Sequence, residues 1–164
     1  MPSKVVEDCA KLLAAQELNI AFAESATVGR MAAEFGLTDE AGKILKGGIV
    51  CYDAGVKEDL LKVDDKLVED FTPESAEVTE AAAKGLRALM PAKIHVAITG
   101  LTCPGGSETY EKPVGTIFIV GLMHAQMLFS KRIYLQGDEQ QIIRDTAKEV
   151  ALLISNAIRS AELP

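Results

Sequence analysis

Apolar positions recur along this chain with two spacings, and these predict which segments are helices and which are strands. Helical spacing, with apolar side chains three or four residues apart, marks four segments: residues 3–16, the stretch after Asp53, residues 75–89 and the stretch after Asp138. Short apolar runs of the kind found in buried strands occupy residues 18–23, 49–52 and 93–98. Two longer runs, 114–122 and 126–135, are joined by a very short link, which predicts an antiparallel pair.

The order of these segments predicts the fold. Helices and strands alternate until the late hairpin, which is typical of a mixed sheet enclosed by two layers of helices. We therefore expect residues 1–164 to form a single α/β domain with a three-layer α/β/α architecture. Polar residues mark the expected helix starts, which are Ser25 or Thr27, Asp53, Ser75 and Asp138.

Composition narrows the functional classes. The net charge of -7 and the lack of a dense basic stripe argue against a nucleic-acid-binding protein. The apolar runs are too short and too interrupted to cross a bilayer, and the first residues do not resemble a signal peptide. We therefore expect a cytoplasmic protein with no membrane partner. Three widely spaced cysteines fit neither a disulfide framework nor a zinc site, so neither a metal nor a cofactor is expected.

Two segments rich in glycine and hydroxyl groups directly follow predicted strands. One runs from Glu24 to Arg30 after the first strand, and the other runs from Thr99 to Ser107 after the third. Because ligands bind at the carboxyl ends of strands in open α/β sheets, the two segments predict a shared pocket. Their small and hydroxyl-bearing residues suit a polar small molecule, and a phosphorylated one in particular.

Ser25 is the candidate nucleophile of this pocket. At a strand-to-helix junction its hydroxyl would face a ligand, and the helix start would supply N–H donors for an oxyanion. The alternative is that Ser25 only caps the helix. A nucleophilic serine needs a base, but His95 lies within an apolar strand and His124 at the hairpin turn, so both are expected to be structural. Lys57 remains, either as a desolvated lysine that loses its charge near neutral pH or as a solvated helix residue.

Other polar residues near the two loops also have more than one interpretation. Glu24 is expected either to orient the nucleophile or the lysine, or to be paired at the sheet edge. Lys112 follows the second loop outside any Walker pattern, and it is a candidate point charge for a ligand phosphate, as are Arg30 and Arg144. Cys103 is interpreted as a small packed residue because it has no plausible histidine partner.

Four ordered motifs resemble one known family. Glu24 to Gly29 is similar to the E-S-C-T-G-G signature of the C-terminal domain of competence/damage-inducible protein CinA, whose stand-alone relatives are nicotinamide-nucleotide amidases. Gly47 to Lys57 resembles the family's G-G-x-V-x-Y-x-x-x-x-K, and Thr99 to Gly115 resembles its T-G-x-x-G-P-G-G … E-K-P-V-G. Gly137 to Arg144 resembles its G-D-R-x-x-(x)-R, so the match covers nearly the whole chain.

This resemblance implies an activity and a set of roles. The implied activity is hydrolysis of the carboxamide of nicotinamide mononucleotide to nicotinate mononucleotide and ammonia. The implied nucleophile is Ser25 and the implied base is Lys57, with support from Glu24, Thr27 and Thr99. The positions implied to bind the pyridine nucleotide are Gly29, Arg30, Tyr52, Gly100, Gly105, Gly106, Lys112 and Arg144.

The chain departs from these signatures on the expected substrate side. Ala26 replaces a cysteine, Val28 and Cys103 replace glycines, Glu139 replaces an arginine, and the loop to Lys112 is one residue longer. Two alternatives to the nucleotide amidase therefore stay open: a catalytically silent nucleotide-binding module and an amidase for another small amide. A homo-oligomer is also expected, because glycine-rich loops on a small apolar domain often complete their pockets at interfaces.

Overall fold

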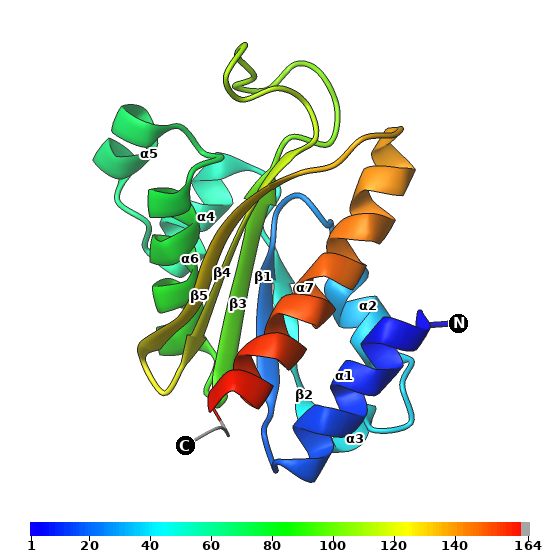
Figure 1. Cartoon of the computed structure of the whole chain (residues 1–164). Helices are drawn as coiled ribbons and strands as arrows, with labels where there is room; N and C mark the ends of the chain where they lie inside the picture. The colour runs from blue at the N-terminus through cyan, green and yellow to red at the C-terminus, as the bar shows by residue number, and fades with distance from the viewer. Residues whose placement is uncertain (162–164) are drawn as a thin grey trace.

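A computed structural model describes residues 1–161 as a five-stranded mixed sheet with helices on both faces (Figure 1). The strand order is β2-β1-β3-β4-β5; β1 is parallel to β2 and β3, and β4 is antiparallel to both of its neighbours. The strands are β1 (Ile20–Glu24), β2 (Leu45–Val50), β3 (Ile94–Gly100), β4 (Thr116–Met123) and β5 (Gln126–Tyr134). The predicted three-layer α/β/α arrangement and the predicted antiparallel hairpin are confirmed.

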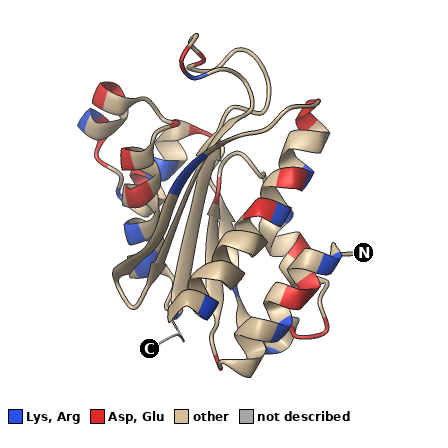
Figure 2. Ribbon diagram, viewed as in Figure 1, with Lys and Arg blue, Asp and Glu red and all other residues tan. Residues whose placement is uncertain are grey.

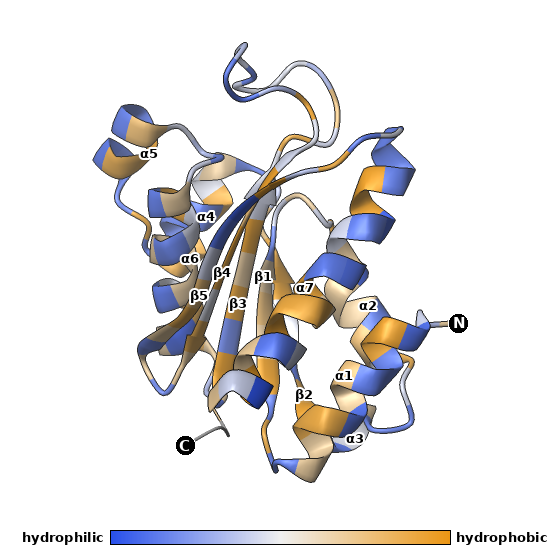
Figure 3. Cartoon of the chain, in the orientation of Figure 1, coloured by the Kyte–Doolittle hydropathy of each residue, from blue (hydrophilic) through white to orange (hydrophobic). Residues whose placement is uncertain are grey.

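Each face of the sheet is covered by its own group of helices. One side carries α1 (Lys4–Ala15), α2 (Arg30–Gly36), α3 (Ala41–Ile44) and α7 (Glu139–Ala161) (Figure 1). The other side carries α4 (Ala54–Leu61), α5 (Asp65–Phe71) and α6 (Ala76–Leu89). The helices carry acidic and basic side chains together (Figure 2), whereas the strands are largely hydrophobic (Figure 3). None of the helices within residues 1–161 is long and apolar enough to cross a membrane.

Alternate residues of the central strand supply two separate cores. In β1, Ile20 and Phe22 belong to the core formed with α1, α2 and α7, whereas Ala21 and Ala23 belong to the core formed with α4 and α6. All five residues of β1 are buried, as a parallel strand covered on both faces requires. Burial of each large apolar side chain contributes about 1.5–3 kcal/mol, so the strand that leads to Ser25 is held firmly from both sides.

The polar residues predicted to start three helices do so through their side chains. Asp53 accepts a hydrogen bond from the Gly55 N–H (2.8 Å), and Ser75 accepts one from the Val78 N–H (3.2 Å). Asp138 accepts one from the third residue of α7 (2.8 Å). Each side chain satisfies a backbone donor that the first turn of a helix leaves without a partner.

Two predicted boundaries are wrong. No helix begins at Ser25 or Thr27; α2 begins at Arg30, because Val28 and Gly29 have φ angles of +49° and +89°, and left-handed backbone does not continue a right-handed helix. The strand predicted at 49–52 lies instead at Leu45–Val50 and includes its two glycines. They pair with β1 at close range: a Cβ on Gly48 would lie 3.2 Å from the carbonyl oxygen of Phe22. The short helices α3 and α5 were not predicted.

Candidate active site

A pocket of about 230 Å³ lies at the carboxyl ends of the parallel strands, the edge at which the sequence predicts a ligand site. One wall is Ser25 and Ala26, which follow β1, and Tyr52 and Glu74 contribute from the segments that precede α4 and α6. The other wall is residues 100–106, the first part of the long β3–β4 loop that rises above this edge (Figure 1). The structure thus brings Ser25, Tyr52, Gly100, Gly105 and Gly106 together around one cavity.

Ser25 is fixed at the pocket wall by an extension of the sheet. Its N–H donates to the Ile98 carbonyl on β3 (2.9 Å), and the Cys51 N–H donates to the Glu24 carbonyl (2.8 Å). Backbone pairing therefore continues for one residue beyond β1, at Ser25, and for one residue beyond β2, at Cys51. The residue is only 6% exposed, yet it lines the cavity. A ligand in the pocket would meet a serine whose backbone is already ordered.

The Glu24 carboxylate organises the turn that follows Ser25. Its Oε2 accepts hydrogen bonds from the Thr27 hydroxyl (2.6 Å) and the Met31 N–H (2.9 Å), and its Oε1 accepts one from the Ala32 N–H (2.8 Å). Glu24 therefore caps α2 from outside the helix, which is neither of the roles expected from the sequence. The N–H groups of Met31 and Ala32 have this acceptor and that of Arg30 donates to the Thr27 carbonyl (2.8 Å), so the expectation that the start of α2 holds an oxyanion is wrong.

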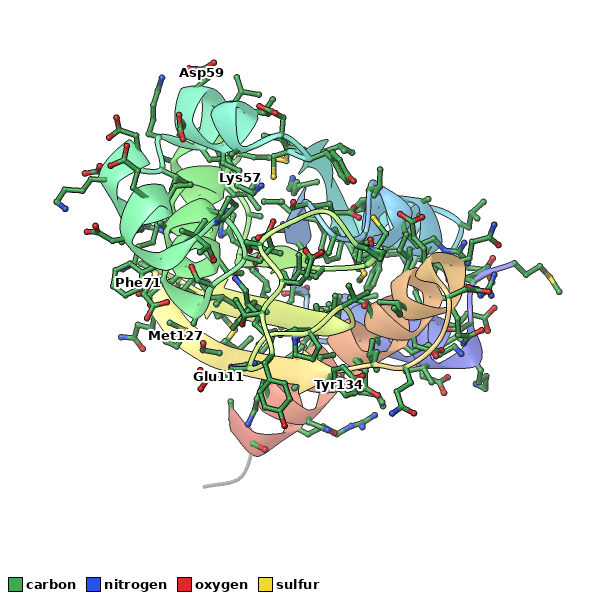
Figure 4. The ribbon with its side chains drawn as sticks, turned by 90° about the horizontal axis from the view of Figure 1, so that it is seen from above. Lys57, Asp59, Phe71, Glu111, Met127 and Tyr134 are labelled. Carbon is green, nitrogen blue, oxygen red and sulfur yellow. The ribbon has the colours of Figure 1, made fainter. Side chains whose placement is uncertain are left out.

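Lys57 is buried despite its charged group. It lies on α4, is 1% exposed, and points to the inner side of the helix, whereas Asp59 lies on the outer side (Figure 4). Burial lowers the pKa of the Lys57 ammonium, and the nearby Cys51, Glu74 and Asp53 oppose this effect. The interpretation of Lys57 as a solvated helix residue is therefore wrong. A lysine in this setting loses its proton more readily than one in water.

Glu74 connects this lysine to the pocket, and the sequence analysis did not identify it. It lines the cavity, and its charge favours the protonated form of Lys57. Its carboxylate also accepts a hydrogen bond from the Ser107 hydroxyl on the β3–β4 loop. The available signal was its position, directly before the Ser75 cap of a helix that begins at the same edge of the sheet.

Thr99 is held inside the fold beneath the pocket. Its hydroxyl lies 2.8 Å from that of Thr79 on α6, and Thr79 itself donates to the Ser75 carbonyl (2.5 Å). Because the Thr79 proton is used on Ser75, Thr99 must be the donor of the pair. Thr99 thus ties β3 to α6, and its supporting role in catalysis stays a prediction.

Lys112 does not line the pocket but anchors the loop that does. Its Nζ donates to the Thr72 hydroxyl (2.6 Å), the Ser107 hydroxyl (2.8 Å) and the Glu74 carbonyl (3.0 Å). An ammonium has three N–H donors, so these contacts use all of them. The contacts join the β3–β4 loop to the segment between α5 and α6 and leave no donor for a ligand phosphate in this state.

Arg30 and Arg144 lie at a second pocket of about 200 Å³, bordered by the residues before α1, by α2 and by α7. Arg30 forms an ion pair there with the buried Glu34 (2.5 Å), and Arg144 donates to Gln141 (3.1 Å). Gly29, which immediately precedes Arg30, forms the left-handed start of α2 rather than part of the Ser25 pocket. Neither arginine is among the residues that line that pocket.

The glycine-rich wall of the Ser25 pocket holds an anion of its own. The Gly105 N–H donates to Oε1 of Glu108 (2.7 Å). The N–H groups of Gly105, of Glu108 itself and of Gly106 lower the pKa of the Glu108 carboxyl. Its Oε2 is buried and has no hydrogen-bond partner among the described residues.

Both histidines and two of the three cysteines lie outside the lining of this pocket, whereas Cys103 is part of it and half-buried. His95 is buried with Nε2 2.8 Å from the Met90 carbonyl oxygen, and His124 lies at the β4–β5 turn with φ of +49°. Cys9 and Cys51 are buried and unpaired. Over residues 1–161, no three histidine, cysteine, aspartate or glutamate side chains are grouped so as to hold a metal ion.

Comparison with known proteins identifies a family model and relatives that this chain matches. Residues 2–158 match the family model of the CinA C-terminal domain. The chain is 44% identical over 117 residues to a CinA-like protein of Mycobacterium avium, a match that covers 70% of this chain and 26% of the relative. It is 38% identical over 152 residues to a CinA-like protein of Mycobacterium marinum, a match that covers 92% of this chain and 34% of the relative. The chain therefore spans only 26% and 34% of the length of these two relatives.

Solved structures show the same fold at lower identity. A competence-damaged protein (CinA) superfamily protein of Klebsiella pneumoniae superposes with a TM-score of 0.89 at 22% identity, covering 95% of this chain and 97% of that one. A competence/damage-inducible protein of Agrobacterium tumefaciens superposes with a TM-score of 0.84 at 22% identity, covering 96% and 98%.

Proposed function

The chain belongs to the CinA C-terminal domain family, and from that premise we propose that it is an amidohydrolase acting on a pyridine nucleotide. The proposed reaction converts nicotinamide mononucleotide to nicotinate mononucleotide and ammonia, as the resemblance of its motifs implies. One observation carries the proposal: Ser25 and Glu74 line one pocket, and the Glu74 charge acts on Lys57, a buried lysine whose pKa is lowered by burial. A module that only binds a nucleotide has no use for a buried amine at this position.

The proposed mechanism uses the two residues as one unit. Neutral Lys57 takes the hydroxyl proton as Ser25 Oγ attacks the carboxamide carbon. Backbone N–H groups of the pocket wall stabilise the oxyanion that forms. The C–N bond then breaks, and the nitrogen leaves as ammonia with the proton that Lys57 returns. Water hydrolyses the resulting ester, releases the carboxylate product and restores the Ser25 hydroxyl.

Ammonia release from purified protein given nicotinamide mononucleotide tests this function. Replacing Ser25 by alanine is expected to lower turnover by roughly a thousandfold or more, whereas nucleotide binding survives. Ser130→Ala, an exposed serine on β5, is the matched control and is expected to keep the wild-type rate. Near-normal release by the Ser25 variant would refute the mechanism. Nucleotide binding by a wild-type protein that releases no ammonia would support the silent module instead.

A further inference from the structure

We propose that Glu108 determines how well this pocket accepts a phosphorylated ligand. Its carboxylate occupies the backbone amide cradle at Gly105 and Gly106, so a ligand phosphate that binds there must displace it. This inference rests on the function proposed above and names a specificity-determining residue of the same site.

The cradle is part of the pocket wall. Gly105 and Gly106 line the cavity that Ser25 faces, and the Gly105 N–H holds Glu108 Oε1 at 2.7 Å. Successive backbone N–H groups in a turn form a concavity that binds anions, including phosphates. The φ of +102° at Gly105 favours glycine through its backbone conformation alone, because a Cβ built there would meet no atom within 4 Å. The turn thus has the geometry of an anion site, and a side chain of the same loop fills it.

The charges around the pocket make this cradle important for a phosphate. Within the described residues, the pocket lining contains no lysine or arginine, and Glu74 adds a carboxylate to it. The three donors of Lys112 are engaged by Thr72, Ser107 and the Glu74 carbonyl. Besides the hydroxyls of Ser25, Tyr52 and Thr102, the lining therefore offers a phosphate its backbone N–H groups, and Glu108 competes for that of Gly105.

Displacement of the Glu108 carboxylate breaks its hydrogen bond to the Gly105 N–H and loses the stabilisation by the N–H groups of Gly106 and of Glu108 itself. Oε1 holds its hydrogen bond to Gly105, and Oε2 has no partner among residues 1–161. The neighbouring residues 104–106 are exposed. When a competing group occupies a site, the apparent dissociation constant of a ligand rises in inverse proportion to the fraction of molecules in which the site is free. Removing the charge of Glu108 should therefore tighten phosphate binding and leave ligands without phosphate unaffected.

The test is a comparison of ligand affinities by calorimetry in the Ser25→Ala background, where no turnover disturbs binding. Glu108→Gln keeps an oxygen that can accept the Gly105 N–H. Glu111→Gln makes the same change of charge on the same loop, at a side chain that lies well apart from Lys57 (Figure 4). The probes are nicotinamide mononucleotide, inorganic phosphate and nicotinamide riboside, which lacks the phosphate.

Glu108→Gln is expected to lower the dissociation constants of the mononucleotide and of inorganic phosphate by about tenfold, as a charged competitor for the same N–H groups is removed. The riboside constant should stay within about twofold, and Glu111→Gln should change none of them. Equal tightening of the mononucleotide and the riboside, or no change for phosphate, would overturn the proposal.

Glu108→Ala empties the cradle and should lower the dissociation constant of phosphate at least as much as Glu108→Gln does. Weaker phosphate binding in both Glu108 variants would mean that the residue only shapes the loop, and would also overturn the proposal. Because binding is the readout, a failure of the amidase assay with wild-type protein leaves this comparison fully interpretable.

Discussion

Replacing Lys57 by methionine is expected to abolish ammonia release and at the same time to stabilise the fold. Lys57 is 1% exposed, and its lowered pKa shows that the interior disfavours its charge. Methionine has a similar length and no charge. Replacing buried charged groups by packed apolar ones is often neutral or stabilising, by about 1–4 kcal/mol at most. In a domain of this size, each kcal/mol raises the midpoint of thermal unfolding by about 2–4 °C.

The stability that Lys57→Met adds should depend on pH, in a direction set by the lowered pKa of Lys57. Below that folded-state pKa, the lysine is protonated in both the folded and the unfolded chain, and the folded chain bears the whole cost of the buried charge. As pH rises from there toward the ordinary value of 10.5, only the folded chain loses its proton, so the wild type gains stability. The advantage of Lys57→Met is therefore largest below the folded-state pKa and disappears near pH 10.5.

Urea unfolding followed by circular dichroism, repeated at a series of pH values, measures both effects. Lys11→Met, at an exposed position on α1, makes the same change of charge and serves as the control. It should leave activity unchanged and show no comparable pH dependence. A Lys57→Met protein less stable than the wild type at neutral pH, or a stability difference that stays flat up to pH 10.5, would refute the reasoning.

Two further predictions concern backbone positions. Gly85→Ala should destabilise the protein by about 1–3 kcal/mol, because the new Cβ would lie 1.9 Å from the Leu61 carbonyl oxygen, whereas Gly42→Ala, which meets no atom within 4 Å, should not. Val28→Gly should stabilise it by about 0.5–1 kcal/mol, since relief of a φ of +49° at a β-branched residue outweighs the greater freedom of glycine in the unfolded chain. Urea midpoints measure both changes, and the opposite sign in either case would contradict the corresponding argument.

The layered fold could be predicted because its signals are local. Asp53 and Ser75 cap their helices through hydrogen bonds that span two or three residues, and the spacing of apolar positions needs no distant partner. The β1–α2 turn could not be predicted, because its shape depends on the Glu24 carboxylate reaching the N–H groups of Met31 and Ala32. Those contacts span seven and eight residues, and they outweigh the preference of Val28 for extended backbone.

The position of the pocket could be predicted from the sequence, but the burial and pairing of its lysines could not. The rule that ligands bind at the carboxyl ends of strands places Ser25 and the glycine loop at one edge. Lys57 could be recognised as buried only once α4 was seen to pack against α6. The sequence around Lys112 gives no sign of a hydrogen-bond partner, because its partners Thr72 and Glu74 lie about forty residues earlier. Such long-range pairing leaves no periodic signal.

The extension of the sheet at Ser25 has a consequence for how the pocket opens. Amide groups bonded into a central, doubly covered strand exchange with solvent only when a large part of the domain unfolds. The N–H group of Ser25, which continues β1, belongs to this class. Residues 104–106 are exposed and should exchange through small, frequent openings. Hydrogen exchange would thus divide the cavity into a slowly exchanging wall that contains Ser25 and a rapidly exchanging wall at residues 104–106, so a ligand can enter and leave without disturbing the backbone at Ser25.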